Sequence, residues 1–209
     1  MRKRIYIIGA GGHGQVVLDC AREAGFEVVG FLDDNESLIG KVIQGVKVVG
    51  PSSYAKEVND LVVVAIGDNH KRKLVVERLA LDEERFATVI HPKAVMGSNV
   101  KILPGSMIIG GVVVNTCSTI GMHTIINTSS SIDHHNEIGD FVHIAPGVHT
   151  GGFVNIRDLT FVGIGATIIN NIKVGKDVII GAGSVIIRDV PDRVTIVGVP
   201  GRIIKERTE

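Results

Sequence analysis

Aliphatic residues recur every six positions between residues 95 and 190, and this spacing is the dominant pattern of the chain. Divided from Val95, the stretch gives sixteen hexads, and the second position is Ile or Val in fourteen of them, Met96 and Thr150 being the exceptions. The sixth position is small or aliphatic except at Asn136. A β-sandwich would instead show irregular strand spacing with loops, so the pattern predicts a repeat architecture whose units bury one apolar face against each other.

The length of the repeat predicts the shape of each unit. Six extended residues span roughly 20 Å, so three hexads close a triangular coil of eighteen residues. Residues eighteen apart then stack, which predicts a parallel β-helix with an inner aliphatic column. We expect Ile108, Ile126, Ile144, Val162 and Ile180 to line one inner edge.

The pattern before residue 93 is different and alternates strand-like with helix-like segments. Apolar runs at 4–8, 27–34 and 61–67 read as strands, and amphipathic stretches after Gly14 and after Asn69 read as helices. A last short strand is predicted at residues 86–92, FATVIHP. We therefore predict a Rossmann-like α/β domain over residues 1–92, followed by a β-helix domain with a C-terminal tail over residues 93–209.

A glycine-rich turn follows the first predicted strand. Gly9, Gly11 and Gly14 match G-x-G-x-x-G between a strand and a helix, and Asp33 and Asp34 follow about twenty positions later. Backbone amides at such a helix start can receive a phosphate, and the carboxylates can accept from a ribose. The domain is short for a complete NAD fold, so a mononucleotide or nucleotide-sugar site is favoured, with a turn needed only for packing as the alternative.

Composition narrows the class of protein. The formal net charge is zero, which does not favour a nucleic-acid partner. The chain has two cysteines, Cys20 and Cys117, without CxxC spacing, and no apolar run long enough for a membrane span. We expect a reduced, cytoplasmic protein.

Five of the eight histidines lie within the hexads, and most are expected to be exposed at corners or outer faces. No Cys, Asp or Glu set shows ligand spacing around them, so no metal site is predicted. His134 stands beside Asp133 and His135 and half a coil before His143. One chain cannot easily bring His134 and His143 to one reaction centre, but neighbouring prisms in a trimer can. A histidine is a suitable base for direct attack on a thioester, without an acyl-enzyme on Cys117.

GAGGHG, FLDD, VAIGDN, the hexads with IDHH and HIAPGV, and IVGVPGR occur in this order. Together they resemble the bacterial sugar O/N-acyltransferase family, which includes sialic-acid O-acetyltransferases and UDP-4-amino-sugar N-acetyltransferases. The resemblance covers essentially the whole chain. It implies a left-handed β-helix, a homotrimer, acetyl-CoA bound between adjacent prisms, and a nucleotide-linked sugar held by the α/β domain.

The resemblance also implies roles for single residues. His134 would be the general base, with Asp133 and His135 beside it. The acetyl-CoA groove would be lined by His143, Gly152, Ile164 and Ala182. The nucleotide-sugar contacts would come from Gly11, Gly12, His13, Asp33, Asp34, Gly67 and His70.

One position departs from the family. The residue after the base is commonly Glu or Asp, whose carboxylate orients the imidazole and raises its basicity, whereas here it is His135. Asp133 or Glu137 could substitute. The favoured function is acetyl-CoA-dependent N-acetylation of a UDP-4-amino sugar for bacterial surface glycans. O-acetylation of sialic acid or another glycan sugar, a non-catalytic β-helical scaffold, a weakly active homologue and NAD-dependent chemistry are the alternatives.

Overall fold

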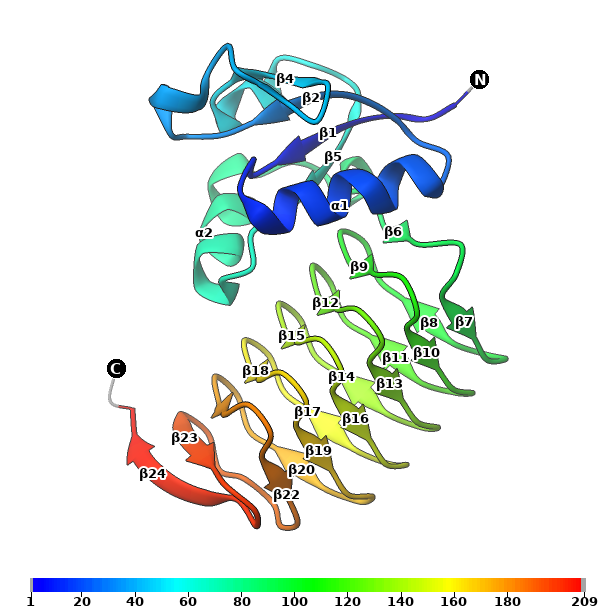
Figure 1. The fold of residues 1–209 in the computed structure, drawn as a ribbon, viewed down its shortest axis with the longest axis vertical. Coiled ribbons are helices and arrows are strands. Elements are labelled where there is room, and N and C mark those ends of the chain that lie inside the picture. The colour runs from blue at the N-terminus through cyan, green and yellow to red at the C-terminus, as the bar shows by residue number, and fades with distance from the viewer. Residues whose placement is uncertain (1, 208–209) are drawn as a thin grey trace.

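The computed structural model describes residues 2–207, which form an α/β domain packed against a long parallel β-helix (Figure 1). The α/β domain has one five-stranded sheet in the order β3-β4-β2-β1-β5. Its strands are β1 (Arg4–Ile8), β2 (Glu27–Leu32), β3 (Val42–Ile43), β4 (Val46–Gly50) and β5 (Leu61–Val64). Its helices are α1 (Gly12–Glu23) and α2 (Asn69–Leu79), with 3-10 turns at Glu36–Leu38, Ser52–Lys56 and Glu83–Arg85.

The two helices cover opposite faces of this sheet. Alternate residues of β1 pack with α1 on one side, through Ile5 and Ile7, and with α2 on the other, through Tyr6 and Ile8. The α1 cluster also includes Met107 of the β-helix. Figure 1 accordingly shows α1 between the sheet and the coils. Burial on both faces explains why the parallel strands read as continuous apolar runs.

Two features differ from the sequence prediction. The hairpin β3–β4 was not predicted; it turns at Gln44 and Gly45, whose φ angles are 46° and 79°. FATVIHP does not form one strand of the α/β domain. Phe86 bridges Val62 of β5, whereas β6 (Val89–Ile90) pairs with the first coil of the β-helix. A division between residues 92 and 93 stays a prediction.

The hexads form the predicted left-handed parallel β-helix with three sheets. The facing sheet, which lies toward the α/β domain, contains β6, β9 (Met107–Ile108), β12 (Ile125–Ile126), β15 (His143–Ile144), β18 (Phe161–Val162), β21 (Ile179–Ile180), β23 (Val194–Val197) and β24 (Arg202–Glu206). Sheet 2 contains β7 (Val95–Met96), β10 (Val113–Val114), β13 (Ser131–Ile132), β16 (His149–Thr150), β19 (Thr167–Ile168) and β22 (Val185–Ile186). Sheet 3 contains β8 (Lys101–Ile102), β11 (Thr119–Ile120), β14 (Glu137–Ile138), β17 (Asn155–Ile156) and β20 (Lys173–Val174).

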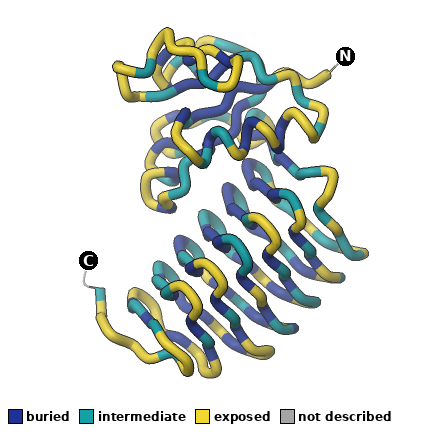
Figure 2. The backbone as a smooth tube through the Cα atoms, in the orientation of Figure 1, coloured by how far each residue is buried: buried dark blue, intermediate teal, exposed yellow. Residues whose placement is uncertain are grey.

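The coil register agrees with the eighteen-residue prediction. Ile126 pairs with Ile108 on the preceding coil and with Ile144 on the following coil, and the column continues through Val162 and Ile180. All five side chains are buried, and Figure 2 shows buried residues recurring along each coil. This column is the core of the β-helix.

The corners use a left-handed backbone at a fixed position. The fifth residue of each hexad has a positive φ from Asn99 to Gly183, and only five of these fifteen residues are glycine. Because this conformation disfavours most side chains by roughly 1–2 kcal/mol, the corners are held by the packing of the coils.

Within the described residues, no helix is long and apolar enough to cross a membrane.

Candidate active site

The glycine-rich loop follows the carboxyl end of β1 and lies beside the carboxyl ends of β2 and β5. Gly9 and Gly14 are required by packing, because a Cβ on Gly14 would lie 1.9 Å from the Gly9 carbonyl oxygen and Gly9 has φ +102°. A Cβ on Gly11 or Gly12 would meet nothing within 4 Å. Packing therefore explains two glycines of the loop, while the other two leave open space above the start of α1.

The two predicted carboxylates after β2 point to different partners. Asp33 Oδ2 accepts a hydrogen bond from the Ala10 backbone amide at 2.8 Å, so it braces the glycine loop. Asp34 accepts from the Ser52 amide at 2.9 Å and forms an ion pair with Arg78. Burial acts to raise the pKa of Asp34, but the hydrogen bonds from Ser52 and the Arg78 guanidinium outweigh it and lower the pKa.

His143 lies on the facing sheet directly below the β5–α2 loop. Its Nδ1–H donates to the Gly67 carbonyl at 2.9 Å, and its Nε2 accepts from the Asn127 side-chain amide at 3.2 Å. These two bonds fix one neutral tautomer. Burial, together with the nearby Arg72 guanidinium, lowers the pKa of His143 to about 4, although the bond to Gly67 acts in the opposite direction.

His13, in the first turn of α1, faces the same place. Its ring centroid is 5.9 Å from that of His143. Burial first, and then His143 and Arg72, lower the pKa of His13 to about 4. Its Nε2 is buried and has no hydrogen-bond partner among residues 2–207. Two neutral imidazoles therefore meet beneath the glycine loop.

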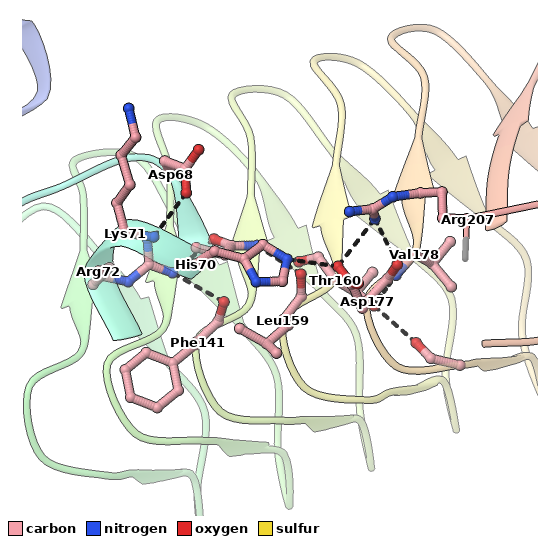
Figure 3. Close-up of polar contacts among 12 residues, drawn as sticks. Asp68, His70, Lys71, Arg72, Phe141, Leu159, Thr160, Asp177, Val178 and Arg207 are labelled. Carbon is pink, nitrogen blue, oxygen red and sulfur yellow. Dashed lines mark hydrogen bonds and ion pairs between the residues drawn. The ribbon is translucent and has the colours of Figure 1, made fainter. Parts of the chain in front are cut away.

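Arg72 of α2 joins the two domains (Figure 3). The side chain is fully buried, and its Nε donates to the His123 carbonyl at 2.7 Å. Its two terminal nitrogens donate to the carbonyls of Ile66, Phe141 and, at longer range, Val142, and to the Asn69 side chain. The guanidinium thus fastens the β5–α2 loop, and with it Gly67, onto two successive coils.

His134 lies far from this cluster. It sits at the His134 corner, which we define as the turns between sheets 2 and 3 that carry His134, His135, Gly152 and Phe153. The Asp133 carboxylate accepts from the His134 backbone amide at 2.8 Å, and His134 Nδ1 lies 3.1 Å from His135 Nδ1. A Cβ on Gly152 would lie 2.5 Å from His134 Cε1, so this glycine provides the space for the imidazole.

The predicted acetyl-CoA residues fall in three places. His143 is on the facing sheet and Gly152 is at the His134 corner. Ile164 and Ala182 are exposed, one coil apart, at the Ile164 corner, the turns between the facing sheet and sheet 2. Beside them, a Cβ on Gly165 or Gly183 would meet nothing within 4 Å, so the backbone at this edge is open. The assignment of these residues to acetyl-CoA stays a prediction.

His70 takes part in a separate cluster with the C-terminal strand. Its Nε2 lies 2.8 Å from Asp177 Oδ1, which also accepts from Arg207 at 3.0 Å (Figure 3). These side chains border a cavity of about 440 Å³ whose floor includes Phe161 and Ile179 and whose far end reaches His143. The sequence reasoning did not predict Asp177 or Arg207 at any site.

The expectation that most repeat histidines are exposed was only partly right. His123 and His143 are buried, because the α/β domain covers the corner and the sheet on which they lie. Within the described chain, no group of three or more His, Cys, Asp or Glu side chains is placed to hold a metal ion. The sequence also missed Arg72, which is buried, and Asn127, which is half-buried, because neither residue type predicts such a role in a helix or a hexad.

Comparisons with known proteins identify the family of this chain. Residues 4–79 match the model of the PglD N-terminal domain. GDP-perosamine N-acetyltransferase from Escherichia coli O157:H7 is 31% identical over 213 residues, covering 95% of each chain. Serine acetyltransferase from Bacillus pumilus is 36% identical over 146 residues, but the match spans only 57% of that protein.

Two solved structures are similar over nearly the whole chain. One is a histidine variant of perosamine N-acetyltransferase from Caulobacter crescentus in complex with CoA and GDP-perosamine; it has a TM-score of 0.90 and 33% identity, with 97% of each chain covered. The other is the acetyltransferase domain of PglB from Neisseria gonorrhoeae in complex with acetyl coenzyme A; it has a TM-score of 0.90 and 31% identity, with 98% of this chain and 100% of that chain covered. The chain therefore belongs to the bacterial sugar acyltransferase family that its motifs resemble.

Proposed function

We propose that the protein transfers the acetyl group of acetyl-CoA to the amino group of a nucleotide-linked amino sugar, with a UDP-4-amino sugar as the preferred acceptor. The observation that carries this proposal is the convergence of Gly11, Gly12, His13 and the neutral His143 where the α/β domain meets the facing sheet. The relatives named as perosamine N-acetyltransferases support the same reaction class.

The acceptor half of the site is the loop edge of the α/β domain. The first amides of α1 begin at an uncapped N-terminus, since Gly11 has no capping side chain and the first turn contains no acidic residue. Such a helix start binds phosphate oxygens. Asp33 fixes the loop through Ala10, and Gly67 is fixed by Arg72 and His143. The nucleotide diphosphate would lie on α1, with the sugar extending toward the β-helix.

The base would come from the His134 corner. His134 Nε2 takes a proton from the amino group of the acceptor sugar. At the same time the amine nitrogen forms a bond to the thioester carbonyl carbon of acetyl-CoA. The C–S bond then breaks, and the CoA thiolate leaves with that proton. This direct transfer uses only a positioned imidazole, and a general base of this kind contributes about 10²- to 10⁴-fold.

The proposed site is completed by a second copy. The α/β domain covers the facing sheet, whereas His134 lies at the corner between the other two sheets. Exposed apolar side chains mark both edges that would meet, Phe153 and Ile169 near His134 and Ile164 on the other edge. In a homotrimer the His134 corner of one copy would adjoin the Ile164 corner of the next. Sedimentation equilibrium at the trimer mass is the expected result.

Acceptor assays test the activity directly. The protein is incubated with acetyl-CoA and, separately, a UDP-4-amino sugar, GDP-perosamine, CMP-sialic acid or L-serine, and CoA release and acetylated product are measured. Acetyl transfer to a nucleotide-linked amino sugar is expected; transfer only to CMP-sialic acid or L-serine would move the assignment to O-acetylation. His134→Ala should lower kcat by at least about 100-fold. A wild-type rate in that variant would eliminate His134 as the base.

The cellular location is part of the proposal. Both cysteines in the described chain are free, Cys20 buried and Cys117 exposed, which suits a reducing compartment. Because acetyl-CoA and nucleotide sugars are cytoplasmic metabolites, we place the reaction in the cytoplasm.

A further inference from the structure

The rings of His134 and His135 contact each other through the same type of nitrogen. The two Nδ1 atoms are 3.1 Å apart, and the ring planes are at 85° to each other. When both imidazoles are neutral, only one of the two Nδ1 atoms carries a proton. Two Nδ1–H groups would collide, and two lone pairs would repel. The two histidines therefore hold opposite tautomers.

The position of the His135 ring is imposed by the coil. Residue 135 has φ 56°, the left-handed conformation found at this position of each hexad from Asn99 to Gly183. Its ring stacks on Phe153 of the next coil, with centroids 4.7 Å apart and planes 15° apart. Asn136 pins the same turn by donating to the carbonyls of Asp133 at 2.6 Å and Gly151 at 3.0 Å. The turn and the stack on Phe153 thus place the His135 ring beside the proposed base.

The neighbouring carboxylates bind elsewhere. Asp133 accepts from the Asn115 amide and the His134 backbone, which together hold its pKa below the ordinary value, and it makes no hydrogen bond to the imidazole. Glu137 accepts from Asn155 at 2.6 Å. Cys117, on the preceding coil, contacts Thr116, and His149 contacts Ser131. Among the described residues, His135 is the residue that forms a hydrogen bond to a ring nitrogen of His134.

We propose that His135 is a positioning residue that accepts a hydrogen bond from His134 Nδ1–H and thereby presents His134 Nε2 as the base. This inference rests on the proposed function, which makes His134 the base. A neutral imidazole here replaces the carboxylate that the family commonly places after the base. His135 fixes the tautomer of His134 but supplies no negative charge to stabilise the imidazolium.

Two substitutions of His135 introduce residue types that already occupy the equivalent turn position in other coils. Asn99 and Asn171 occupy the equivalent turn position with φ 58° and 61°, and Phe153 does so with φ 58°. His135→Asn places an amide oxygen where Nδ1 of His135 lies, so the acceptor is kept. His135→Phe keeps the stack on Phe153 and removes the acceptor. We expect kcat within about 5-fold of wild type for H135N and a loss of about 10- to 100-fold for H135F.

A spectroscopic measurement separates positioning from mere packing. In ¹⁵N-histidine-labelled protein, His134, identified by its loss in His134→Ala, should show the Nδ1–H tautomer in wild type and H135N and a mixture in H135F. His135→Glu should likewise show the Nδ1–H tautomer of His134, because an ionised carboxylate can only accept a hydrogen bond.

An Nε2–H tautomer of His134 in the wild type, or wild-type rate and tautomer in H135F, overturns the inference. A His134→Ala enzyme with full activity would instead remove the proposed base, whatever tautomer is seen.

Discussion

Acidification should destabilise this protein through buried histidines, and His123 offers the clearest test. Its ring lies between Phe86 and Phe141, with centroid distances of 4.7 and 5.1 Å. Its Nδ1 is buried and has no hydrogen-bond partner within the described residues. Burial and the Arg72 guanidinium lower the pKa of His123 from 6.5 to about 4. The folded state therefore holds this imidazole neutral.

The size of the effect follows from proton linkage. The unfolded chain binds a proton at His123 below its ordinary pKa of 6.5, while the folded chain resists protonation until about pH 4. Stability is complete above the unfolded value and is lost as the pH falls between these two values. At about pH 5 the loss is about 2 kcal/mol for one such residue. His13 and His143 behave in the same way, so the three together approach the whole stability of a typical domain.

His123→Phe is the informative variant, because Phe141 already occupies the same register one coil further on, with φ 55°. The midpoint of thermal unfolding is followed by circular dichroism at about pH 8 and about pH 5, at one protein concentration. The drop between the two should be smaller in H123F by about 2 kcal/mol, or roughly 4–8 °C. His123→Gln, which also cannot titrate, should show the same reduced drop. A drop equal to wild type in both variants would refute the assignment of acid sensitivity to this residue.

Two further predictions concern the joint between the domains and the space beside the base. Arg72→Met should lower the free energy of unfolding by on the order of 4 kcal/mol, because the carbonyls of His123, Ile66 and Phe141 lose a buried charged donor. Urea unfolding measures this loss, and a value below about 1 kcal/mol would contradict the prediction. Gly152→Ala should lower kcat by about 100-fold with little change in the unfolding midpoint, because the alanine Cβ at position 152 would displace the His134 imidazole. An unchanged kcat would show that His134 does not act from this position.

The β-helix was predictable because its pattern is local and repeated. The second residue of fourteen hexads is Ile or Val and packs in the core, and Met96 and Thr150 occupy the same position without changing the register. The hairpin β3–β4 was missed because its turn is Gln44–Gly45, a dipeptide with a weaker turn signal than Asn-Gly or Asp-Gly. The strand at residues 89–90 was recognised, but its partner in the β-helix is decided by long-range pairing.

The candidate site was predicted as residue types but not as an arrangement. His134, His135 and Asp133 are neighbours in the chain, yet their hydrogen bonds depend on the left-handed turn at His135. Asp33 and Asp34 are equivalent in the sequence, whereas only Asp33 supports the glycine loop. Lys71, Arg72 and Lys73 look alike as a basic run, and the docking of α2 on the coils selects Arg72 for burial.

The sequence by itself determined the coil, the α/β alternation before it and the family, because hydrophobic period and short motifs act over a few residues. The tertiary structure decided which polar groups meet. The contacts of Gly67 with His143 and of Arg72 with Phe141 join residues 76 and 69 positions apart, and no local pattern records such pairs. The neutral state of His143 follows from its burial under the second domain and from the cation beside it. Both arise only when the chain has packed.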